Sequence, residues 1–139
     1  PASESVKEIE MLEGSCHCGQ VKWQYDGLPE GATACNCTSC RRYGALWAYG
    51  YENEDVRTSG STKEYIRGPS IGFHFCPQCG NVAFWRSQKP NDEGRRRLGF
   101  NLRLAEPGPI MGLPIGHFDG LEKWEDLPND GRCVKDLWF

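Results

Sequence analysis

Residues 76–80 have the sequence Cys76-Pro77-Gln78-Cys79-Gly80, in which two cysteines and a glycine have the spacing of a metal-binding turn. Two further cysteine clusters precede it, Cys16-His17-Cys18 and Cys35-Asn36-Cys37-Thr38-Ser39-Cys40. Together the three clusters hold seven of the eight cysteines in the 139 residues. Seven thiolates divide as four plus three, because a structural zinc ion is closed by four ligands whereas a catalytic zinc ion keeps one position free. The count therefore predicts two zinc ions, one structural and one catalytic.

A disulfide framework is the alternative that eight cysteines suggest. Cys-x-Cys pairs bridge poorly, because a disulfide needs Cα atoms about 4.4–6.8 Å apart and converging Cβ vectors. Residues 1–13 are rich in charge and contain no apolar stretch typical of a secretory leader. We therefore expect metal-bound thiolates and a cytoplasmic protein.

Residues 76–80 are typical of a zinc knuckle. The proline fixes φ, and the final glycine lets the chain turn back so that backbone N–H groups face the sulfurs. The first cluster is followed by a glycine in the same way, at Gly19. A knuckle supplies half a site, so the two clusters together predict one closed structural site with the ligands Cys16, Cys18, Cys76 and Cys79.

The remaining thiolates, Cys35, Cys37 and Cys40, predict the catalytic zinc site, with one position open to water or substrate. The alternative is a second closed site, with a fourth ligand from Cys133, His17, His74 or His117. Cys133 by itself is typical of a small packed residue. The sequence leaves the choice between an open and a closed site undecided.

Apolar residues alternate along the chain with the period of two that is typical of strands. The alternating segments are residues 21–25, 47–51, 71–75, 82–85 and 98–104, separated by turns rich in glycine and proline. One short helix is predicted at residues 38–43, with Thr38 or Asn36 as N-cap. With no linker or repeat, residues 1–139 are expected to form a single, mainly β domain with little helix.

Charge and hydropathy disfavour two classes of partner. The net charge is −3, and Arg95-Arg96-Arg97, the only basic run, follows an acidic turn and is interpreted as a solvated loop or strand entry. Proteins that bind nucleic acid usually present a basic face. No apolar stretch approaches the roughly 20 residues that span a bilayer. We expect neither nucleic acid nor membrane as a partner.

The motifs resemble those of the glutathione-dependent formaldehyde-activating enzyme family, whose vertebrate relatives include centromere protein V. The matching segments, in order and spacing, are Gly14-Ser-Cys16-His-Cys18-Gly19-x-Val21, Cys35-x-Cys37-x-x-Cys40-Arg41 and Phe75-Cys76-Pro-x-Cys79-Gly80. Asn101-Leu-Arg103 and His117-Phe-Asp119-Gly120 are also similar, so the resemblance covers nearly the whole chain. It implies a tent-like arrangement of coiled antiparallel sheets, and it implies the same division of the cysteines between a structural and a catalytic zinc ion.

The resemblance also implies a reaction, the condensation of formaldehyde with glutathione to S-(hydroxymethyl)glutathione, formally a carbon–sulfur lyase reaction in reverse. The open zinc position is then expected to bind the thiolate or to polarise the aldehyde oxygen. Glutathione is anionic, so Arg41, Arg42 or Arg103 could pair with its carboxylates. Asn101 could bond its amides, and the aromatic residues of 47–51 could form a pocket wall.

Two other functions fit the same residues. A zinc-stabilised binding module would keep both metals but catalyse nothing. A thiol redox protein would rely on Cys133, the one cysteine outside the clusters, although Arg132 alone is a weak activator of a thiol. We expect the enzyme, with a small-molecule thiol such as glutathione and an aldehyde as its partners.

Overall fold

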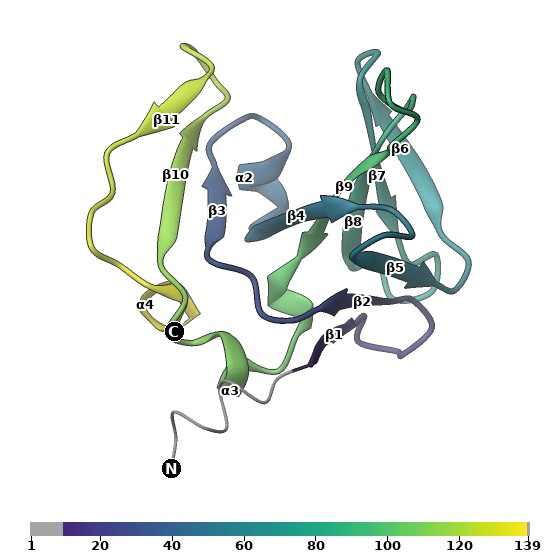
Figure 1. The fold of residues 1–139 in the computed structure, drawn as a ribbon, viewed down its shortest axis with the longest axis horizontal. Helices are drawn as coiled ribbons and strands as arrows, with labels where there is room; N and C mark the ends of the chain where they lie inside the picture. Colours follow the sequence, from purple (N-terminus) through teal and green to yellow (C-terminus); the bar gives the residue numbers. More distant parts are fainter. Residues whose placement is uncertain (1–9, 139) are drawn as a thin grey trace.

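The computed structural model describes residues 10–138, and the prediction of a mainly β protein is confirmed (Figure 1). Strands β1, β2 and β5 form a three-stranded sheet, and an eight-stranded sheet has the order β11-β10-β3-β4-β9-β8-β7-β6. The bounds of the small sheet are β1 (Met11–Ser15), β2 (Lys22–Asp26) and β5 (Val56–Ser59). Those of the large sheet are β3 (Ala32–Cys35), β4 (Trp47–Tyr51), β6 (Lys63–Arg67), β7 (Ile71–Phe75), β8 (Val82–Ser87), β9 (Arg97–Asn101), β10 (Ile115–Asp119) and β11 (Glu125–Leu127).

The large sheet coils, so that its two ends face each other as two walls. Strands β10 and β11 form one wall and β6 to β9 form the other, with β3, β4 and α2 (Cys40–Tyr43) between them (Figure 1). The other helical elements are short: η1 (Leu102–Leu104), α3 (Pro107–Ile110) and α4 (Val134–Trp138). This arrangement matches the expected tent of coiled sheets.

The strand pairs are antiparallel with one exception within residues 10–138. Strand β10 runs parallel to β3, with Phe118 opposite Cys35. This pairing joins two segments that are far apart in the sequence. A hydrogen bond between the side chains of Asn36 and Asp119, which are 83 positions apart, links the same two segments. The late part of the chain therefore reaches the segment that carries the cysteine triplet.

Two local predictions need correction. The alternating segment 98–104 ends as a strand at Asn101 and continues as the 3-10 helix η1. The side chain of Asn101 accepts the N–H of Arg103 and caps this turn, while Leu102 stays fully buried. The predicted helix forms, but its N-cap is Ser39 rather than Thr38 or Asn36, and no side-chain bond caps it.

The buried apolar residues form two clusters. The larger one contains Trp23 and Phe100, whose ring centroids are 4.6 Å apart, and it includes Cys16 and Cys76. The smaller one contains Trp47 and Phe73 and includes Cys37 and Cys40, with Cys35 packed against it. Each set of cysteines is thus built into its own part of the core. Within residues 10–138, no helix has the length and apolar character needed to cross a membrane.

Candidate functional site

The sulfurs of Cys16, Cys18, Cys76 and Cys79 all lie within 4.8 Å of one another. The Cys16–Cys18 and Cys18–Cys76 sulfur distances are 3.7 Å and 3.5 Å. A tetrahedral zinc ion with Zn–S bonds of about 2.3 Å spaces its sulfurs about 3.8 Å apart. All eight cysteines are free of disulfides, so these residues fit a metal ion with four thiolate ligands.

Two turns deliver these four sulfurs, residues 16–21 after β1 and residues 76–81 after β7, and the second turn has one more residue between its two cysteines. In each turn the N–H of the first cysteine donates to the carbonyl five positions later, and the glycine N–H donates back to the first cysteine's carbonyl. The four N···O distances are 2.9–3.0 Å. Gly19 and Gly80 have φ values of 86° and 83°, which favour glycine. Each turn therefore supplies two ligands and is closed by a glycine N–H, three positions after Cys16 and four positions after Cys76.

Backbone N–H groups face the sulfurs of the second turn, as its sequence predicts. Those of Gln78 and Cys79 donate to the Cys76 sulfur at 3.4 and 3.5 Å. The bond from Cys79 is the main cause that lowers the pKa of Cys76, and the N–H of Asn81 is the main cause that lowers the pKa of Cys79 to about 6. These bonds favour the thiolate form, which is the form that binds a metal.

The sulfurs of Cys35, Cys37 and Cys40 form the second cluster, again within 4.8 Å of one another. Cys35 ends β3 and Cys40 begins α2, so one continuous segment of six residues supplies all three. The N–H of Cys40 donates to the Cys37 sulfur at 3.3 Å, and the N–H of Cys37 donates to the Cys35 sulfur at 3.5 Å. The hydrogen bond from Cys40 lowers the pKa of Cys35 to about 6 and raises that of Cys40, which keeps the proton.

Trp47 on β4 offers an N–H to the same cluster. Its Nε1 is buried and has no oxygen or nitrogen acceptor within the described chain. The Trp47 side chain partly offsets the rise in the pKa of Cys40, so its N–H faces that sulfur. An unsatisfied buried N–H costs about 1–3 kcal/mol. A metal-bound thiolate at Cys40 would therefore accept the hydrogen bond that the Trp47 N–H is placed to donate.

The turn after β10 closes over the cluster, a feature that the sequence did not reveal. The backbone of Gly120 bonds to Cys35 and lowers its pKa further. A Cβ at Gly120 would lie 2.8 Å from the Cys35 sulfur and 3.1 Å from the Cys37 Cβ, so the approach requires glycine. The carboxylate of Asp119 holds this turn by accepting the N–H groups of Leu121, Glu122 and Lys123 at 3.0–3.2 Å. It also accepts the side-chain amide of Asn36, which lies between two of the cysteines, at 3.2 Å.

The three-cysteine cluster borders a cavity of about 640 Å³ that all three cysteines line. Aromatic side chains from several strands line it. They are Trp47 and Tyr49 of β4, Phe73 of β7, Trp85 of β8, Phe118 of β10, and Trp124, which precedes β11. Trp47 and Tyr49 thus line the cavity as expected, whereas Tyr51 does not and instead lies 3.8 Å below the guanidinium of Arg95. Cys16, Cys18, Cys76 and Cys79 do not line it.

A fourth ligand from Cys, His, Asp or Glu does not join the three cysteines within residues 10–138. The proposed candidates bond elsewhere. His74 is held between Thr62 and Glu64, and the Nε2 atom of His117 lies 3.2 Å from the Asp130 carboxylate. The Cys133 sulfur donates to Asp136 at 3.4 Å. His17 lies exposed in the turn of residues 16–21, where its backbone N–H donates to the Asn81 side chain.

The substrate-binding candidates from the sequence lie outside the cavity. Arg41 is exposed and lines no part of it. The Asn101 amide is buried and donates to the Val82 carbonyl at 2.9 Å. Arg103 donates to the backbone carbonyls of Gly44 and Leu137. Asn101 and Arg103 therefore hold η1 and the neighbouring segments in place.

The basic side chains that do line the cavity are Arg67 and Arg97. Arg97 belongs to the run interpreted as a solvated loop or strand entry, and it is the first residue of β9. Its guanidinium lies 4.8 Å from the ring centroid of Tyr49, another cavity residue. Only the pairing of β9 with β4 places it there, so local charge patterning gave no signal for it.

Comparison with known proteins identifies a family whose matched segment contains both cysteine clusters. The family model described as glutathione-dependent formaldehyde-activating enzyme matches residues 11–101, which contain both cysteine clusters. A crystal structure of a Rhodobacter sphaeroides protein is 28% identical, covers 68% of this chain and 88% of that chain, and superposes with a TM-score of 0.55. A search of curated proteins gave no match. From the length of the family match, the chain belongs to the glutathione-dependent formaldehyde-activating enzyme family.

Proposed function

We propose that the protein is a zinc-dependent carbon–sulfur lyase that makes and breaks thiol–aldehyde adducts, with S-(hydroxymethyl)glutathione as the adduct that its family suggests. One observation carries this proposal. A cluster of three cysteines with no fourth Cys, His or carboxylate ligand in the described residues opens into a cavity of about 640 Å³. A closed structural site would not border such a cavity on its ligand side.

Cys35, Cys37 and Cys40 would hold the catalytic zinc ion, and Cys16, Cys18, Cys76 and Cys79 the structural one. When bound to three thiolates, zinc supplies a Lewis acid with one free position for a thiolate or a carbonyl oxygen. Thiolate ligands without disulfides favour a reducing compartment, so we also propose a cytoplasmic location and one domain over residues 1–139.

In the forward reaction a sulfur–carbon bond forms between the thiol and the aldehyde. The carbonyl π bond opens onto oxygen, and the thiol proton is transferred to that oxygen, so no oxidant or further reactant is needed. The chain's own contribution is orientation and the exclusion of water by the aromatic walls, including Trp47, Phe73 and Trp124. The reverse reaction breaks the same carbon–sulfur bond, which is the lyase direction.

Zinc X-ray absorption with and without glutathione tests the proposal. Before the thiol is added we expect two zinc ions per chain, with an oxygen neighbour at about 2.0–2.2 Å on one of them. Glutathione should replace that oxygen with sulfur at about 2.3 Å, and S-methylglutathione, which has no thiol, should not. Four protein sulfurs on both ions before any thiol is added would contradict the proposal.

Exchange of ¹³C-formaldehyde into the glutathione adduct separates the enzyme from the alternative, a binding module. The uncatalysed addition is the baseline in the same buffer. An enzyme raises the exchange rate in proportion to its concentration, and the Cys37→Ser variant should return to the baseline. A protein that binds glutathione without changing the exchange rate would be a binding module.

A further inference from the structure

A second cavity of about 420 Å³ shares lining residues with the cysteine cavity. Its lining residues are Thr38, Ser39, Arg42, Tyr43, Tyr65 and Arg67. Ser39 and Arg67 also line the cysteine cavity, so the two spaces meet at these side chains. The hydroxyl oxygen of Ser39 lies 3.5 Å from the Cys37 sulfur. The second cavity therefore starts one side chain away from the candidate metal ligands. We call it the arginine groove.

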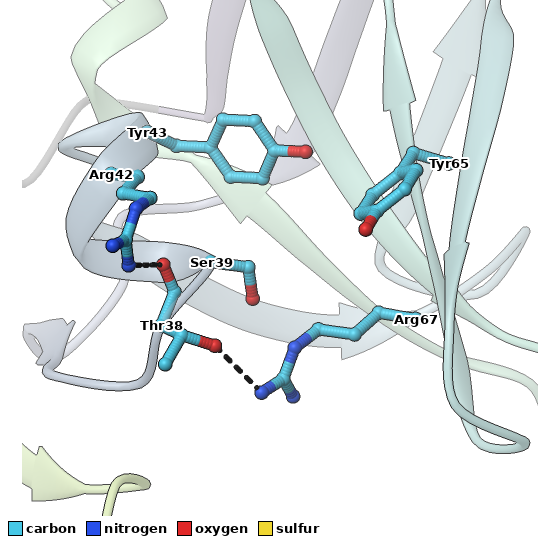
Figure 2. A pocket seen from close by; sticks show the side chains of 6 residues that line it. All are labelled: Thr38, Ser39, Arg42, Tyr43, Tyr65 and Arg67. Carbon is cyan, nitrogen blue, oxygen red and sulfur yellow. Dashed lines mark hydrogen bonds between the residues drawn. The ribbon is translucent and has the colours of Figure 1, made fainter.

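Polar donors surround the arginine groove from two directions. Thr38, Ser39, Arg42 and Tyr43 come from α2 and the residues before it, and Tyr65 and Arg67 come from β6 on the facing wall (Figure 2). Four of the six lining side chains carry hydroxyl groups and two carry guanidinium groups. No acidic side chain lines it. The groove is thus a positively charged space with several donors.

The two guanidinium groups use backbone or hydroxyl oxygens, and not carboxylates, as partners. Arg42 donates to the Thr38 carbonyl at 2.8 Å, and Arg67 donates to the Thr38 hydroxyl at 3.0 Å. Neither forms an ion pair within residues 10–138, whereas Arg57, Arg86, Arg95 and Arg132 each do. A guanidinium has five N–H donors, so both arginines keep donors for another acceptor.

We propose that the arginine groove is the subsite for a carboxylate of the thiol substrate, and that it selects anionic thiols over neutral ones. This inference rests on the proposed function, because the substrate sulfur must occupy the three-cysteine site. The carboxylate then lies between Arg42 and Arg67, where a guanidinium bonds both of its oxygens. The substrate class is a thiol with a carboxylate a few bonds from sulfur, such as a short peptide thiol.

The test compares glutathione with its diethyl ester, which has the same thiol and backbone but no carboxylate. The zinc-loaded wild-type protein should bind glutathione more tightly than the ester. Arg67→Gln and Arg42→Gln should each weaken glutathione binding about 10–100-fold, which is the range expected for a lost bond to a charged group. Neither variant should change binding of the ester. Arg57→Gln, which removes an arginine that lines neither cavity, should bind both thiols as the wild type does.

Calorimetry gives the affinities, and zinc content with circular dichroism checks that each variant is folded. Arg67→Lys keeps the charge without the planar fork and should recover only part of the affinity. The comparison of the two thiols on the wild type needs no variant, so a variant that fails to fold does not remove the test. Equal wild-type affinity for glutathione and ester would overturn the subsite while the proposed function stands. Binding of neither thiol would overturn both.

Discussion

The two cysteine clusters use the same ligand atom in different surroundings. The four-cysteine cluster joins two separate turns, and Cys18 and Cys76, whose sulfurs are in contact, are 58 positions apart. The three-cysteine cluster comes from one segment of six residues and borders a cavity. A link between segments 58 positions apart costs the unfolded chain about 2 kcal/mol more conformational entropy than a link within six residues. The comparison therefore assigns stability to the first cluster and leaves the second available for chemistry.

The surroundings of the clusters support the same division. Cys16 and Cys76 are buried in the larger apolar cluster, close to residues of both sheets. The three-cysteine cluster packs with Trp47 and Phe73, and these two side chains also line the cavity. Loss of the first site would disturb the larger apolar cluster, whereas loss of the second would disturb the smaller one beside the cavity.

The largest expected effect is that of Cys76→Ser. It opens the four-cysteine site, where the proposed zinc ion would contribute on the order of 10 kcal/mol to folding. That is comparable to the whole stability of a domain of this size, about 5–15 kcal/mol, so the variant should be largely unfolded at room temperature. Circular dichroism melts and metal analysis give the result. Cys133→Ser is the control, and it should stay folded with both metals. A folded Cys76→Ser protein would break the division of roles.

Cys37→Ser should have a smaller effect on stability and a complete effect on activity. The variant should fold, bind one zinc ion per chain and melt within several degrees of the wild type, because the four-cysteine site is untouched. The ¹³C-formaldehyde exchange rate should fall to the uncatalysed baseline. If this variant unfolds and Cys76→Ser does not, the two clusters have been assigned to the wrong roles.

Gly120→Ala sharpens the comparison without touching a ligand. Its Cβ would lie 2.8 Å from the Cys35 sulfur, so the turn must move, at a cost of about 1–3 kcal/mol. We expect the second zinc ion to be lost at lower chelator concentration and the first to be retained. Gly116→Ala, on the strand β10 that leads into this turn, is the matched control, because the nearest atom to its Cβ would be the Ala32 carbonyl oxygen at 3.8 Å. Equal zinc loss in both variants would show that the turn does not support the triplet.

Trp47→Phe is expected to have the smallest effect. It keeps an aromatic ring but removes the N–H that faces Cys40, and the loss of an outer hydrogen bond to a metal ligand weakens metal affinity by about tenfold or more. Competition with a zinc chelator measures the affinity of the second ion. Trp23→Phe removes an N–H that donates to the Asn101 carbonyl at 3.2 Å and not to a sulfur, so it should lower the melting temperature and leave zinc affinity unchanged. The reverse pattern would contradict the role of Trp47.

The sequence by itself determined the chemistry of the ligands and the class of the fold. Cysteine spacing predicted which sulfurs converge within each segment through local backbone geometry, and the count of seven thiolates predicted that the two segments ending in glycine share one site. Period-two alternation placed β2, β4, β7, β8 and the start of β9, since this pattern is local too. It failed after Asn101, where a side-chain cap, which alternation does not register, starts the 3-10 turn.

Only the tertiary structure decided what surrounds the triplet. Asp119 and Gly120 reach Cys35 through a parallel pairing with β3 that no local pattern announces. Arg67 and Arg97 come to the cavity from different strands, while Asn101 and Arg103, which the motif suggested, hold backbone instead. The physical reason is the range of the interactions. Ligand geometry and strand period are set within a few residues, but a cavity is the space left between elements that meet only when the whole chain packs.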